Sequence, residues 1–182
     1  MRLEDLEVPV LRPRPGPAPE DPRLGAALPA CLEAARSGAR LELRLLADLH
    51  RLAVPSSRFR SGPAFAKGGR ERYGFDPGTL ALLDRRLAAV HAWHPLHAAL
   101  AAYLDLQFFH PFEDGNARAG RLAFHFHAAR GGLSFRLLAP LFTLPVPAGS
   151  LRAYQALVRL AVAVSGEPSS RVPAPRPPFP EP

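Results

Sequence analysis

The sequence has little cysteine, little lysine and no long apolar run. One cysteine, Cys31, stands among 182 residues, which excludes an intramolecular disulfide and a zinc site built from several cysteines. The first residues lack the apolar stretch of a secretion signal, and no run approaches the ~18 apolar residues of a membrane span. We therefore expect a soluble cytoplasmic protein with no membrane partner.

Lysine is almost absent, and arginine carries the positive charge. Lys67 is the single lysine among 23 basic residues, and the net charge is +7. Residues 24–165 hold 17 basic and 9 acidic side chains, a balance that favours anionic ligands. A nucleic-acid binder would need aromatic side chains interleaved with the arginines. Only 8% of the residues are aromatic, most of them at core spacing, so a nucleic-acid partner is disfavoured.

Proline is unevenly distributed along the chain. Thirteen of the 22 prolines lie in residues 9–22 and 168–182. Such segments bury too little apolar surface to offset chain entropy, so we expect Pro-rich disordered ends over 1–23 and 166–182. The segment between them, 24–165, has the length of one domain.

Apolar side chains in this central segment recur at helical spacing. One further stretch, residues 63–75, carries a Gly68-Gly69 pair suited to a tight turn and is predicted to form a short exposed hairpin. The predicted fold is therefore all-α, a compact helical bundle with one β-hairpin flap. Helices are predicted over about 24–36, 40–53, from Asp76-Pro77 to the His94-Pro95 break, 96–108, 116–130 and 151–164.

A loop rich in reactive side chains joins two of the predicted helices. A glycine-containing loop that leads into a helix presents free backbone N–H groups and the positive end of the helix dipole, a combination suited to phosphate. Arg118 and Arg121 are three residues apart, so both can reach one polyphosphate from the same side of the helix. The pattern suggests a nucleotide. The segment reads His110-Pro111-Phe112-Glu113-Asp114-Gly115-Asn116-Ala117-Arg118-Ala119-Gly120-Arg121.

Two further residues of this loop fit nucleotide chemistry. Asp114 is placed to hold Mg²⁺ against the same phosphates. His110 has an ordinary pKa of ~6.5, which suits a general base at neutral pH. Each residue also has a structural explanation, because Asp and Asn cap helices, arginines lie on solvated faces and lone histidines are often structural. The clustering favours an anion site, since adjacent arginines repel one another unless an anion compensates.

The string from His110 to Arg121 resembles the defining His-Pro-Phe-x-Asp/Glu-Gly-Asn-Gly-Arg-x-x-Arg motif of the Fic family. It matches every specified position except Ala117. The likeness covers roughly residues 40–165. It extends to Leu49-His50-Arg51-Leu52 and Arg60-Ser61-Gly62 before the family's flap, to His94-Pro95-Leu96 before the motif, and to Gly131-Gly132 after it.

This resemblance implies a compact all-helical fold and, most often, transfer of AMP from Mg·ATP to a Ser, Thr or Tyr hydroxyl of a target protein. By the same resemblance His110 takes the hydroxyl proton, Asp114 coordinates Mg²⁺ and Phe112 anchors the loop. Arg118 and Arg121 stabilise charge on the outer phosphates. The flap at 63–75 pairs with extended target backbone as an added strand. The nucleotide-binding residues implied are Gly115, Asn116, Ala117, Arg118 and Arg121.

Two alternatives accompany this interpretation. Ala117 replaces the usual glycine, so its methyl group can intrude where phosphate or ribose approaches, which would leave a catalytically weakened Fic-like binding module. The related Doc-like toxins bind the nucleotide reversed and transfer the γ-phosphate.

The family's inhibitory Ser/Thr-x-x-x-Glu-Gly/Asn segment is absent, because none of the nine glutamates precedes Gly or Asn. The chain is therefore expected to be unrestrained in cis or held by an antitoxin-like inhibitor protein.

Overall fold

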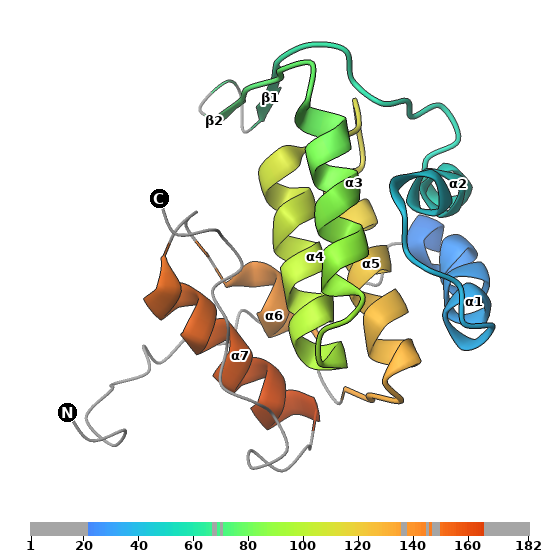
Figure 1. The fold of residues 1–182 in the computed structure, drawn as a ribbon, viewed down its shortest axis with the longest axis vertical. Coiled ribbons are helices and arrows are strands. Elements are labelled where there is room, and N and C mark those ends of the chain that lie inside the picture. Colours follow the sequence, from blue (N-terminus) through green and yellow to red (C-terminus); the bar gives the residue numbers. More distant parts are fainter. Residues whose placement is uncertain are drawn as a thin grey trace.

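A computed structural model describes residues 22–66, 69, 71–135, 138–144, 146 and 150–165. The observed elements confirm the all-α prediction with one hairpin (Figure 1). Residues 1–21 and 166–182 of the Pro-rich ends and the Gly68 position of the predicted turn lie outside the described residues. Disorder was also expected for Pro22 and Arg23, but these two residues form the start of the first helix. The elements are α1 (Pro22–Arg36), α2 (Leu43–Ala53), β1 (Ala64–Ala66), β2 (Glu71–Tyr73), α3 (Thr79–Val90), α4 (Pro95–Phe109), α5 (Asn116–Arg130), α6 (Ala139–Thr143) and α7 (Leu151–Ser165).

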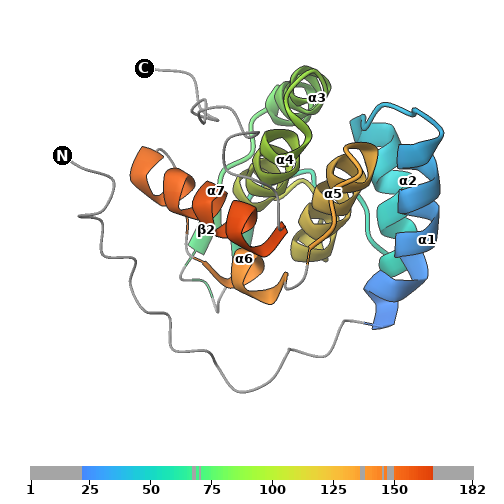
Figure 2. The same cartoon turned by 90° about the horizontal axis from the view of Figure 1, so that it is seen from below.

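Helices α4 and α5 form the centre of the molecule. Figures 1 and 2 show them between α1 and α2 on one side and α6 and α7 on the other. One hydrophobic cluster joins α1, α2 and α3 to one side of the central pair, through residues such as Leu46, Leu87 and Phe126. A second cluster joins α6 and α7 to the other side, through residues such as Leu100 and Leu157. The sequence predicts a central position for α5 alone, because apolar residues lie on most sides of that helix. Alanines on α4 supply the additional apolar face that buries it on both sides.

Two glycines let α4 and α5 pack closely at both ends. A Cβ on Gly120 would lie 2.7 Å from the Gln107 amide nitrogen and 3.0 Å from the Tyr103 ring. A Cβ on Gly131 would lie 2.2 Å from the Pro95 Cβ. The loop from His110 to Gly115 therefore connects two helices whose separation is fixed by packing.

The hairpin pairs as a two-stranded antiparallel sheet at the same end of the molecule as this loop (Figure 1). Its register places Ala64 opposite Tyr73 and Phe65 opposite Arg72. This confirms the hairpin predicted over 63–75. The Phe65 side chain is 65% exposed, so the flap presents an apolar side chain to solvent.

Three local predictions need correction. The predicted helix at Asp76-Pro77 begins at Thr79, because the Thr79 hydroxyl accepts the Asp76 N–H and closes a turn before the helix. The four-residue spacing of Leu96, Leu100, Leu104 and Phe108 predicts that Phe108 faces the core, yet its side chain is 50% exposed. The short helix α6 was not predicted, since its five residues are too few to show a helical period.

Candidate functional site

The reactive loop is held by strand-like pairing with the segment that precedes the flap. The Arg60 N–H donates to the Pro111 carbonyl and the Glu113 N–H donates to the Arg58 carbonyl, each at 3.0 Å. The Phe112 ring is 2% exposed and stacks on Phe59, with ring centroids 5.0 Å apart. The predicted anchor role of Phe112 agrees with this burial. The loop is thus a paired and packed segment, fixed before α5 begins.

His110 ends α4 in a left-handed conformation, with φ 44° and ψ 59°. It is the one non-glycine residue with positive φ among the described residues. Its Nδ1 lies 2.7 Å from the Gln107 carbonyl oxygen. A carbonyl only accepts, so we assign the proton to Nδ1. In the neutral ring Nε2 is then the basic nitrogen, as a general base requires.

The surroundings of His110 favour its neutral form. Burial lowers the pKa of His110, and the positive charge of Arg60 lowers it further. The bond to the Gln107 carbonyl and the charge of Glu71 act in the opposite direction without reversing the shift. The Tyr73 ring stacks on the imidazole with centroids 3.5 Å apart. The lowered pKa favours the neutral imidazole that a general base requires, and Tyr73 of the flap covers one face of the ring.

Asn116 closes the loop on itself. Its Oδ1 accepts the Phe112 N–H at 2.9 Å and its Nδ2 donates to the Phe112 carbonyl at 2.8 Å. Asn116 is 7% exposed. The side-chain amide expected to bind an anion is thus engaged within the loop, and the backbone N–H at this helix start is the group left to face a ligand.

Gly115 has φ +76°, and any side chain at this position would be both strained and crowded. A Cβ would lie 2.5 Å from His50 Nε2 and 2.7 Å from Val54 Cγ2. The His50 Nε2–H donates to the Gly115 carbonyl at 3.2 Å, and its ring stacks on Phe112 with centroids 4.1 Å apart. The same carbonyl accepts the Ala119 N–H at 2.9 Å, the first bond of α5. His50 therefore supports the loop from beneath, and burial lowers its pKa.

Asp114 is exposed and lies at the outer edge of the loop. Its Oδ1 accepts the Gly115 N–H at 2.6 Å, and its Oδ2 lies 3.9 Å from Arg118 Nη2. The Ser57 hydroxyl donates to the Asp114 carbonyl at 3.0 Å, which fixes the backbone under the carboxylate. An exposed carboxylate beside a helix start fits Mg²⁺ bound together with phosphate oxygens, since Mg²⁺ takes one or two protein carboxylates.

Arg118 and Arg121 lie against different elements. Arg118 donates to the Ala53 carbonyl at the end of α2, at 3.4 Å, and neighbours Asp114. The Arg121 guanidinium carbon lies 5.2 Å from the Phe142 ring centroid, over α6. Arg118 is thus next to the loop, while Arg121 rests on an aromatic ring that a cation contacts favourably. Ala117 is exposed on the first turn of α5.

Sequence reasoning included His50 and Arg60 in segments that resemble the family but gave them no role in the site, and it did not single out Tyr73. His50, Arg60 and Tyr73 each touch the loop or His110 directly. The available signal was indirect: His50 lies on the apolar stripe of α2 and is fully buried there. A buried polar side chain needs a partner, and the loop backbone is that partner.

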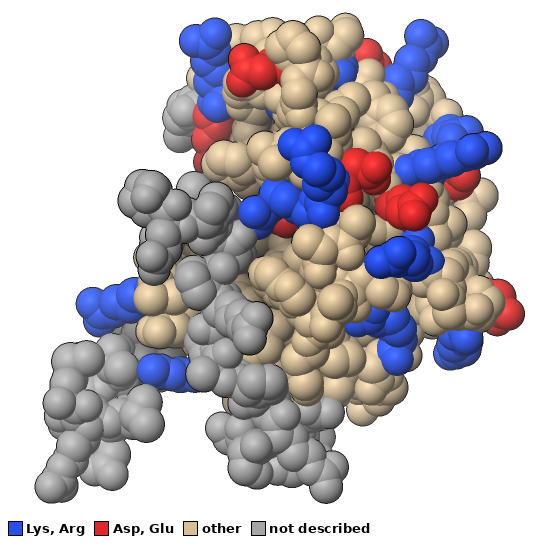
Figure 3. Space-filling model, viewed as in Figure 1, with Lys and Arg blue, Asp and Glu red and all other residues tan. Residues whose placement is uncertain are grey.

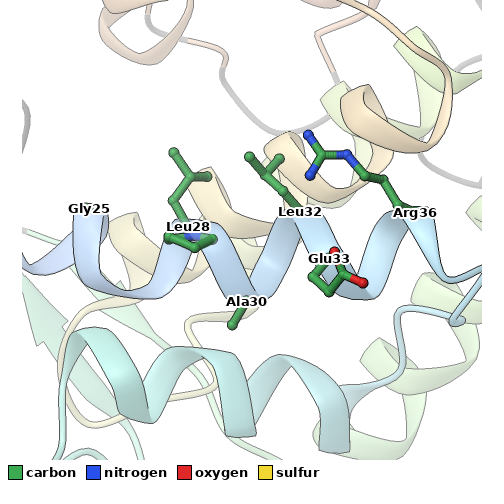
Figure 4. A pocket seen from close by; sticks show the side chains of 7 residues that line it. Gly25, Leu28, Ala30, Leu32, Glu33 and Arg36 are labelled. Atoms are coloured by element: carbon green, nitrogen blue, oxygen red, sulfur yellow. The ribbon is translucent and has the colours of Figure 1, made fainter.

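Other features of the described residues lie apart from the loop. A groove along the outer face of α1, lined by residues such as Leu28, Leu32 and Arg36, contains none of the predicted site residues (Figure 4). On the face seen in Figure 3, acidic side chains lie among the basic ones.

No described helix has the length and apolarity to span a membrane. His94 accepts the Leu96 N–H and His97 contacts the Tyr154 hydroxyl, as packed helical histidines do.

The family model described as Fic/DOC family matches residues 40–128. The matched region runs from just before α2 through most of α5 and includes the whole loop from His110 to Arg121. Residues 40–128 of the chain belong to the Fic/DOC family. Fic/DOC domains are generally transferases, so the chain has a Fic-type function in general terms. No curated protein matches the chain.

Proposed function

We propose that this Fic/DOC protein is a protein adenylyltransferase that moves AMP from Mg·ATP to a Ser, Thr or Tyr hydroxyl of a target protein. The observation that carries the proposal is the Nδ1–H bond of His110 to the Gln107 carbonyl at 2.7 Å. This bond leaves Nε2 of His110 as the basic nitrogen, next to a loop that leads into the N-terminus of α5.

In the proposed reaction Nε2 of His110 accepts the proton of the target hydroxyl as its oxygen attacks the α-phosphorus. The new P–O bond forms as the bond to pyrophosphate breaks, and pyrophosphate carries away the leaving electron pair. Asp114 would hold the Mg²⁺, which when bound neutralises phosphate charge. The backbone N–H group of Asn116 would bind a phosphate oxygen, and that of Gly115 would do so only after leaving Asp114 Oδ1.

The two arginines would complete the phosphate site. Arg118 lies beside the loop and would contact the outer phosphates with a small rotation. Arg121 would have to leave the Phe142 ring to join it, which costs about 0.5–1 kcal/mol for an exposed cation–π contact. A polyphosphate that accepts charge-assisted bonds from two guanidinium groups offsets that cost.

The hairpin would supply the docking edge for the target. It lies at the same end of the molecule as the loop, and Tyr73 at its base stacks on the His110 ring. Extended target backbone added to this short sheet would pass close to the imidazole.

The test uses ATP labelled at two positions. With Mg²⁺ and cell extract, α-³²P-ATP is expected to label a protein band. His110→Asn should abolish the label, because asparagine tolerates the left-handed backbone yet offers no base. His125→Ala, a histidine of α5 outside the loop, is the control and should keep the label.

Other outcomes identify the alternatives. A band labelled only by γ-³²P-ATP would assign the Doc-like phosphotransfer. Binding of Mg·ATP by calorimetry without transfer from either label would identify a weakened binding module. Absence of any nucleotide binding by folded protein would contradict all three.

A further inference from the structure

The Arg60 side chain meets the backbone of three separate segments. Its Nε donates to the His110 carbonyl, and one Nη2–H donates to the Phe109 carbonyl at 2.8 Å. The other three N–H groups reach the two ends of the flap, at Gly62 just before it and at Tyr73 and Gly74 within it. Nη1 donates to Gly62 at 2.6 Å and to Tyr73 at 3.3 Å, and Nη2 donates to Gly74 at 2.6 Å.

These contacts use every donor that the group has. A guanidinium carries five N–H groups, and here each meets a different backbone carbonyl. Arg60 is 5% exposed, and no described carboxylate lies within ion-pair distance of it. Its charge is balanced instead by the carbonyls that end α4, the negative end of that helix dipole. The Phe75 ring packs against its guanidinium carbon at 4.8 Å.

Arg60 thereby controls two geometries at once. The left-handed conformation of His110 is unfavourable for a residue with a Cβ, and the bonds to the Phe109 and His110 carbonyls fix the peptide groups on either side of it. The bonds to Gly62, Tyr73 and Gly74 hold both ends of the hairpin. The same planar group therefore joins the flap to the imidazole.

From this geometry we infer that Arg60 is a positioning residue that fixes the base of the flap to His110. The consequence for catalysis rests on the proposed function: Arg60 keeps the target backbone that pairs with the hairpin aligned with the His110 imidazole. A lysine cannot replace it, because an ammonium has three donors at a point and cannot serve five carbonyls arranged around a plane.

The first test needs no mutation. In ¹⁵N NMR of the full chain, the Arg60 Nη protons are expected to give separate, slowly exchanging signals, because each is bound. Exposed Arg85 on α3 is the internal reference and should show averaged signals. Averaged, fast-exchanging Arg60 signals would overturn the inference.

The second test uses Arg60→Lys with Arg85→Lys as the matched control. In folded Arg60→Lys we expect the His110 ring to populate both tautomers and the β1–β2 amides to exchange faster. Label transfer from α-³²P-ATP should fall about 100-fold, as displacement of a catalytic group by about 1 Å does. Nucleotide affinity by calorimetry should stay unchanged, because Arg60 does not belong to the phosphate site.

The outcomes distinguish failure of the Arg60 inference from failure of the proposed function. A wild-type tautomer and wild-type hairpin exchange in folded Arg60→Lys would overturn the inference even if the enzyme transfers AMP. Absence of Mg·ATP binding in the wild-type chain, with the NMR results as expected, would remove the proposed function and leave the link between Arg60 and His110 standing.

Discussion

At the scale of single residues, two glycines share one backbone conformation and differ in surroundings. Gly38 has φ +79° with nothing within 4 Å of an added Cβ, whereas Gly115 has φ +76° with two side chains inside 3 Å. The sequence marked Gly115 through the motif, but its reason for being glycine comes from His50, a residue 65 positions earlier. Tertiary contacts of this kind leave no local pattern.

We predict that Gly115→Ala destabilises the protein by about 2–4 kcal/mol. About 1 kcal/mol comes from the left-handed backbone and about 1–3 kcal/mol from crowding against His50 and Val54. Gly38→Ala is the matched control and should lose only the backbone part. Urea unfolding of both variants measures the difference, and equal losses would contradict the crowding.

We predict that Ala117→Gly improves nucleotide binding while lowering stability. Ala117 is exposed on the first turn of α5, so removing its methyl group opens space for phosphate, while glycine in a helix costs about 1 kcal/mol. Calorimetry with Mg·ATP and urea unfolding measure the two effects. An unchanged or weaker affinity would mean that the methyl group does not intrude.

At the scale of elements, the sequence predicted α5 with its observed bounds and α1, α2, α4 and α7 within a few residues. Their apolar periods are long, and their ends carry Pro, Gly or capping residues. Sequence reasoning also placed the candidate residues in one loop. It did not separate Arg118 from Arg121, because the direction of a long side chain depends on partners such as Ala53 and Phe142 from other elements.

Helix α5 also buries His127, a histidine with ring neighbours but with no hydrogen bond to the described residues. Both ring nitrogens of His127 lack a hydrogen bond among the described residues, and its ring lies 6.1 Å from that of His91. Burial, reinforced by Arg130 and His91, lowers the pKa of His127 to about 3. As the pH falls, His127 therefore binds a proton near pH 6.5 in the unfolded chain and only near pH 3 in the folded chain.

We predict that His127→Leu removes part of the acid sensitivity of the fold. Because the pKa of His127 is lower in the folded chain, its contribution to the stability of the fold is fully present above pH 6.5 and is lost as the pH falls toward 3. The expected slope is about 1.4 kcal/mol per pH unit. Urea unfolding between pH 7 and pH 4.5 should show a shallower decline in the variant, and parallel curves would contradict the assignment.

At the scale of the whole molecule, the central helices are shared by two cores. Leu122 and Phe126 of α5 belong to the cluster with α1 to α3, and Phe124 belongs to the cluster with α6 and α7. Helix α7 packs through the second cluster alone. Parts of a protein that share fewer buried contacts open at lower free energy.

We predict that α7 opens without the rest of the chain. Native-state hydrogen exchange should give its amides a lower opening free energy than those of α2 and α5. Leu157→Ala, which empties a fully buried position, should accelerate exchange in α7 by lowering its opening free energy, and leave α2 unchanged. Equal acceleration in both helices would show that the two clusters unfold together.

The contact of Gly131 with Pro95 has a mechanical consequence. It sits at the end of the α4–α5 pair opposite the loop, and a 15-residue helix is about 22 Å long. A side chain at position 131 would wedge the two axes apart, and a tilt of about 5° over that length carries the far end through about 2 Å. Such a tilt would displace His110 although position 131 lies far from it. We therefore expect some substitutions that abolish activity to lie at residues that do not contact the substrate.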